Sequence, residues 1–187
     1  MEPGALSLSR LRGTMGQTWL IVLFGIAYLI SQVTILIILE PLGDQFAKLQ
    51  CFGFSAERYV TVFRSWEETG VMTAYRAHFA LDDVHWIWYA AFFTFLLCRL
   101  FERNRLPHRL NWILLLPLAS GLLDWYENQL QHVFLSSDDF STIVDPLPLL
   151  STLASDIKWM LASVYLLLTA VLMLRGWFRR GQAIRRL

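Results

Sequence analysis

Polar side chains lie on one face of an otherwise apolar stretch in the second half of the chain. Asp124, Glu127, Asn128 and Gln131 are spaced at i, i+3, i+4 and i+7, so a helix would place all four on one face. Ionisable side chains in an apolar helix are costly unless they face a partner or a water-filled cavity. A pair of carboxyl groups in such a setting is typical of acid/base chemistry. We therefore take Asp124 and Glu127 as a candidate acid/base pair.

The candidate partner of these acids is Lys158, which lies in the next apolar run. A helix antiparallel to the first would place Lys158 at the same depth as Asp124 and Glu127. A buried ammonium group is tolerated only when it is paired, so we predict an ion pair between Lys158 and a carboxylate. Lys158 would act as charge partner or electrophile, and the predicted catalytic residues are Asp124, Glu127 and Lys158.

The predicted ligand-binding residues come from all four long apolar runs. Asp156 would add a third acid facing Lys158, and two tryptophans would form apolar walls. The predicted ligand-binding set is Gln32, Asp83, His85, Trp125, Asn128, Asp156 and Trp159. Single histidines beside scattered carboxyls lack the E-x-x-H pairs of di-iron bundles, so we expect no metal and no cofactor.

The composition indicates the elements that must position these residues. Of 187 residues, 56% are hydrophobic and 17% charged, and the mean hydropathy of +0.45 is too high for an ordinary soluble domain. A net charge of +1 gives no reason to expect a nucleic-acid partner. Crossing a membrane takes about 20 apolar residues. We predict an all-α, polytopic, four-transmembrane-helix bundle forming one integral membrane domain over residues 1–187, with spans at 17–39, 84–100, 112–134 and 148–174.

The basic residues predict the orientation of the bundle. The segments before the first span, between the second and third, and after the fourth hold 11 of the 16 basic residues, Arg10, Arg185 and Arg186 among them. By the positive-inside rule these segments and both termini are cytoplasmic. The first run lacks a small-x-small cleavage site, so we expect a retained helix. The ratio of 14 arginines to two lysines fits a GC-rich bacterial source, and we expect the protein to lie in a bacterial inner membrane.

The predicted external segment, residues 40–83, is long enough to carry structure. Apolar residues recur near helical spacing over 55–79, interrupted at Gly70, which predicts an amphipathic helix or a helical hairpin. It would lie over a site or simply pack on its own bundle. Asp82 and Asp83 are predicted to cap the N-terminus of the second transmembrane helix.

Several stretches resemble those of a known group of proteins. Residues 49–57, 66–70 and 117–128, with the pattern Asp-x-x-Glu-Asn, and the pair Lys158-Trp159 resemble a group of small uncharacterised bacterial four-helix membrane proteins. The resemblance covers most of the chain and implies the same topology, but no reaction. A looser similarity of architecture is to the emopamil-binding and sigma-2-receptor type of domain, a membrane bundle with buried acids around a sterol-sized pocket.

Three functions are compatible with these observations. The favoured one is a membrane-embedded enzyme or binding protein for a lipid-like or small apolar molecule, with membrane lipids as its surroundings. The second is a proton or cation relay or transport module, which would require a homo-oligomer. The third is an accessory or assembly subunit of a larger membrane complex, in which the polar cluster only holds helices together.

Overall fold

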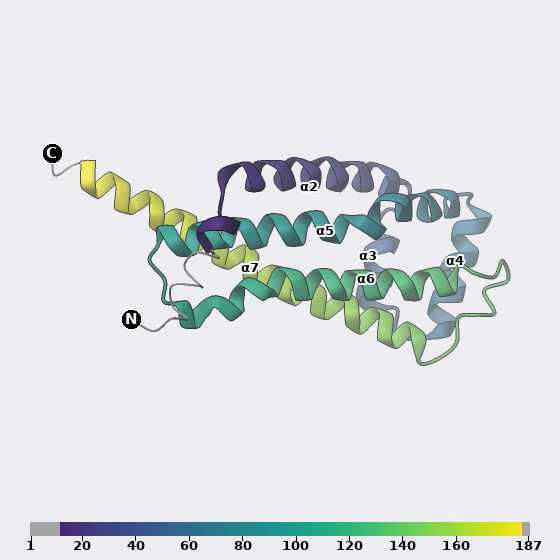
Figure 1. The fold of residues 1–187 in the computed structure, drawn as a ribbon. Helices are drawn as coiled ribbons and strands as arrows, with labels where there is room; N and C mark the ends of the chain where they lie inside the picture. Colours follow the sequence, from purple (N-terminus) through teal and green to yellow (C-terminus); the bar gives the residue numbers. More distant parts are fainter. Residues whose placement is uncertain (1–11, 185–187) are drawn as a thin grey trace.

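A computed structural model describes residues 12–184 of the chain, with side chains to residue 178, and the only regular secondary structure in this part is helical (Figure 1). Four long helices form the body, and shorter helices connect them. The long helices are α2 (Thr18–Leu39), α5 (Met72–Arg103), α6 (Leu116–Phe134) and α7 (Leu147–Ile184). The short ones are η1 (Glu40–Leu42), α3 (Asp44–Phe52), α4 (Ala56–Glu68) and η2 (His108–Leu115).

Helix α5 is the centre of the arrangement. Helix α2 packs along one side of α5, α6 packs along another, and α6 also packs closely on α7. Gly121 allows the close approach of α6 to α5, since a Cβ atom there would lie 3.0 Å from the Trp86 ring and 3.3 Å from the Ala90 Cβ. Helices α2 and α7 have no extended contact with each other, and α3, which follows α2 along the chain, packs against α7.

Three described helices are long and apolar enough to cross a membrane: Thr18–Leu42, Met72–Arg103 and Leu147–Phe178. Their outward faces carry exposed large apolar side chains, such as Ile37 on α2 and Leu167 on α7. Helix α6 does not meet the same criterion. It carries the polar stripe, and the residues before it, predicted to belong to the same span, form the separate helix η2.

The predicted inner and outer segments lie at opposite ends of the bundle (Figure 1). The start of α2, the connection through η2 and the end of α7 share one end, and α4 and the loop at 135–146 share the other. At the first end, buried Arg12 donates from Nε to Asn111 Oδ1 at 2.6 Å and from one terminal nitrogen to the Leu106 carbonyl at 2.8 Å. Arg10, Arg185 and Arg186 lie outside the described residues.

The predicted start of the second long helix was wrong. Helix α5 begins at Met72, so Asp82 and Asp83 lie inside it and cap nothing. No helix-breaking residue separates Met72 from these acids, which lets the amphipathic segment continue directly into the apolar one. The amphipathic segment is interrupted at Gly70 as expected, and it forms α4 and the first turns of α5. Helix α4 begins at the cap residue Ser55 and ends before Gly70, whose φ of 77° reverses the chain.

Candidate functional site

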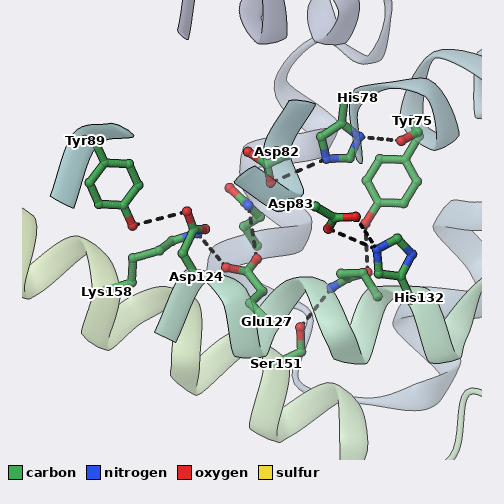
Figure 2. Close-up of polar contacts among 12 residues, drawn as sticks. Tyr75, His78, Asp82, Asp83, Tyr89, Asp124, Glu127, His132, Ser151 and Lys158 are labelled. Carbon is green, nitrogen blue, oxygen red and sulfur yellow. Dashed lines mark hydrogen bonds and ion pairs between the residues drawn. The ribbon is translucent and has the colours of Figure 1, made fainter. Parts of the chain in front are cut away.

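The buried ion pair predicted from the sequence is present, and it has two acceptors (Figure 2). Lys158 Nζ lies 2.6 Å from Asp124 Oδ1 and 2.6 Å from Glu127 Oε2, and donates to both. All three residues are buried, with at most 7% of their surface exposed. The i, i+3 spacing on α6 turns both carboxylates to α7, and α7 presents Lys158 between them.

Each carboxylate has a second donor from another helix. The Tyr89 hydroxyl of α5 donates to Asp124 Oδ2 at 3.1 Å, and Gln50 Nε2 of α3 donates to Glu127 Oε1 at 3.1 Å. Hydrogen bonds to charged groups are stronger than those between neutral groups. The cluster therefore links α3, α5, α6 and α7, and holds one positive charge against two negative charges.

A cavity of about 200 Å³ lies beside this cluster. Its walls come from α2, α3, α5, α6 and α7. Asp124 and Lys158 line it, whereas Glu127 does not and lies behind them. The two acids are therefore not equivalent, because only Asp124 faces the space in which a ligand could lie. The other polar lining residues are Gln32, Gln50, His78, Asp82, His85 and Ser120, and most of the remaining lining is apolar or aromatic.

Three of the predicted ligand-binding residues line the cavity. Gln32 projects from α2. His85 is 6% exposed, and its Nδ1 forms a hydrogen bond of 2.7 Å with Ser31 Oγ. Trp159 lies at the rim with 54% of its surface exposed, and its ring centroid is 5.7 Å from Lys158 Nζ. Asn128 is buried on the same face of α6 but is not a lining residue.

Asp83, Trp125 and Asp156 lie outside the cavity, contrary to the sequence interpretation. Successive residues of a helix are rotated by about 100° around its axis. Asp83 and Trp125 therefore point away from the cavity that Asp82 and Asp124, the residues before them, line. Asp83 is paired at the surface with His132 Nε2 at 3.0 Å, and Trp125 is 45% exposed. Asp156 precedes Lys158 by two residues, which is about 200° around α7, and is not its partner.

The residue that takes the place predicted for Asp83 is its neighbour Asp82, which lines the cavity. Beside it, His78 Nε2 lies 3.9 Å from Asp82 Oδ2, and His78 is 3% exposed (Figure 2). The sequence offered two adjacent acids and no way to choose between them, because the choice depends on how α5 is rotated against its neighbours.

A second cluster of buried polar side chains joins helices at the end of the bundle that carries α4 and the loop at 135–146. Gln131 accepts from the Tyr75 hydroxyl at 2.7 Å and donates to Ser151 Oγ at 2.8 Å and to the Tyr59 hydroxyl at 3.0 Å. Burial raises the pKa of Tyr59, so its hydroxyl stays neutral. Gln131 continues the i, i+7 stripe, which marked it as inward-facing. Its three partners come from three different helices, so its role is to fix their packing.

The remaining reactive side chains give no separate site. Burial raises the pKa of Cys51, which disfavours the nucleophilic thiolate. Within the described part of the chain, no three His, Cys, Asp or Glu residues are grouped so that they could hold a metal ion.

Comparison with protein-family models, with curated proteins and with solved structures gave no match. The geometry of the cavity and its ion pair is therefore the basis for a function.

Proposed function

We propose that the protein crosses a membrane four times and binds a lipid-like or small apolar molecule in the cavity beside Lys158. Helix α6 would be the fourth span. Its polar face is turned to α7 and α5 by the Lys158 contacts, so the charges are not presented to lipid. The end formed by η2 and the last turns of α7 would face the cytoplasm of a bacterial inner membrane, since it carries the basic segments.

The observation that carries the proposed ligand is the composition of the cavity wall. Aromatic and aliphatic side chains such as Phe93, Tyr165 and Leu166 surround most of the space, while a few fixed polar groups converge on one part of it. Binding sites for small molecules generally combine these two features. A polar cluster that only joined helices would not require unfilled space beside it.

Asp124 is the group placed to do chemistry on such a molecule. It faces the cavity, and its orientation is fixed by Lys158 and by the Tyr89 hydroxyl. A carboxyl group held in this way can exchange a proton with a bound molecule if one of its hydrogen bonds is released. Glu127 would hold Lys158 in place from behind.

Mass spectrometry of molecules that co-purify with the protein tests the proposal. The wild type is compared with Ala162→Phe, which places a ring in the cavity, because Ala162 is 6% exposed and lines it. Ala170→Phe is the matched control, since Ala170 lies on an exposed part of the same helix. We expect one defined species per chain in the wild type and in Ala170→Phe, and its loss in Ala162→Phe.

The opposite result has a clear meaning. Bulk membrane lipid in equal amounts in all three proteins would refute the cavity as a binding site. The function would then be that of an accessory subunit whose polar cluster joins helices, and purification in a mild detergent should recover it within a larger assembly.

A further inference from the structure

Two hydrogen-bond acceptors face each other at the outer end of the cavity. His78 Nδ1 is hydrogen-bonded to the backbone carbonyl of Tyr75, which can only accept, so Nδ1 carries the proton. In the neutral ring, Nε2 is then an acceptor, and it points to Asp82 Oδ2 at 3.9 Å. Two acceptors at this distance do not satisfy each other, and both residues line the cavity.

Among the described residues, no lysine or arginine forms an ion pair with Asp82, although the Lys158 ammonium acts on it from a distance. Lys158 is bonded to Asp124 and Glu127, and the described ion pairs give Asp82 no partner except the His78 ring. The neutral side chain of Asn128 also lies beside Asp82 and interacts with its carboxyl group, but it carries no charge. The outer end of the cavity therefore offers a carboxylate and an imidazole nitrogen to a group that donates several hydrogen bonds and carries positive charge.

The rest of the cavity suits an apolar chain. Its lining along α5 extends from His78 to Phe93, a separation of 15 residues, or about 22 Å of helix. The end near Phe93 is bounded by Tyr165 and other aromatic and aliphatic side chains. The cavity is thus long. Asp82 and His78 lie at one end, Asp124 and Lys158 lie further along, and apolar side chains line both ends, with Phe46 beside His78 and Phe93 beside Tyr165.

The cavity also has an opening to the apolar surroundings of the bundle. Leu36 of α2 and Leu166 of α7 both line it, yet 59% and 44% of their surfaces are exposed. The two helices have no extended contact, and α3 packs on α7 near Gln50, so an opening between α2 and α7 would lie beyond α3, toward Leu166. An amphiphile in the outer leaflet would have its head at the level of Asp82 and its chain running inward, as the cavity does.

We infer that the ligand is a single-chain amphiphile with a primary ammonium head group, which enters between α2 and α7 and places its nitrogen between Asp82 and His78. This inference rests on the proposed function and names its ligand class. The head group donates to the Asp82 carboxylate and to His78 Nε2. The chain then passes Asp124, so a group on which this acid acts would lie along the chain and not at the head.

Native mass spectrometry of the full chain released from neutral detergent micelles tests this. The probes are dodecylamine, dodecyltrimethylammonium, dodecanol and dodecanoic acid, which share a chain and differ in the head. We expect one dodecylamine per chain, bound about tenfold or more tightly than dodecanol, because a charge-assisted hydrogen bond is lost with the alcohol. The trimethylammonium probe, which has the charge but no N–H group, should bind more weakly than the amine. The acid should bind most weakly of the four.

Asp82→Asn should abolish the preference for the amine, and Asp83→Asn is the matched control, since Asp83 lies next in sequence but outside the cavity. Equal binding of dodecanol and dodecylamine to the wild type, or an unchanged preference in Asp82→Asn, would overturn the head-group assignment. The proposed function would stand in either case if one chain still bound per protein. Absence of one-to-one binding by all four probes would refute both. The order of affinities among the four probes is measured on the wild type alone, so it tests the head-group assignment even if Asp82→Asn does not fold.

Discussion

Replacing Lys158 with methionine should be among the most damaging single changes in the buried bundle. The variant removes two hydrogen bonds of 2.6 Å and leaves two buried carboxylates without their cation. Removing one partner of a buried ion pair costs about 3–5 kcal/mol of unfolding free energy. Unfolding of the purified protein in mixed micelles, with increasing sodium dodecyl sulfate and helicity as the signal, measures this cost.

The only other lysine provides the control. Lys48 pairs with Asp44 at 2.5 Å, but both side chains are more than half exposed, so Lys48→Met should cause no measurable change. A triple variant, Lys158→Met with Asp124→Asn and Glu127→Gln, removes all three charges and should recover at least half of the loss. Equal stabilities of Lys158→Met and Lys48→Met would refute the reasoning, because the cluster would then hold no compensated charge.

Three further changes test the packing around the site. Gln131→Leu should cost about 1–3 kcal/mol in the same unfolding assay, since it leaves the buried Tyr59 and Tyr75 hydroxyls and Ser151 without their common partner. Gly121→Ala should lower the midpoint of thermal unfolding and cost about 1–3 kcal/mol of unfolding free energy, because its Cβ would lie 3.0 Å from the Trp86 ring. Gly13→Ala is the control and should not lower the midpoint, since its Cβ would have no atom within 4 Å. Burial raises the folded-state pKa of Tyr59 above its usual 10.0. Its contribution to the free energy of unfolding is therefore complete below pH 10 and is lost as the pH rises further. The difference in the free energy of unfolding between the wild type and Tyr59→Phe should shrink above pH 10.

The polar stripe could be predicted from the sequence because helical spacing alone decides which of its residues share a face. Asp124 and Glu127 needed no knowledge of the fold, and Lys158 followed from the cost of an unpaired buried cation. Asp83 and Asp156 were chosen for their charge and depth along the chain. Depth does not determine rotation about the helix axis, so neither acid could be excluded before its helix was placed.

Gln50 shows what spacing cannot reveal. It lies on the short helix α3, outside the long apolar runs, and reaches Glu127 only because α3 folds back against α7. The length of α5 is a related case. The apolar run indicated a helix from residue 84, but helix formation continues through any residues that tolerate it, so the helix begins where Gly70 ends the preceding turn.

The energetics of the cavity distinguish a binding site from a purely structural cluster. At about 24 cal/mol per Å³, leaving the whole space of about 200 Å³ empty would cost at most about 5 kcal/mol, since the space is partly open, and this is comparable with the whole stability of a small domain. An occupant removes this cost, so the wild type should lose stability when it is stripped of bound amphiphiles by extensive detergent exchange. Ala162→Phe, which fills part of the space, should be affected much less by the same treatment. Equal losses in the two proteins would show that the space is not occupied, and would leave the cluster with a structural role alone.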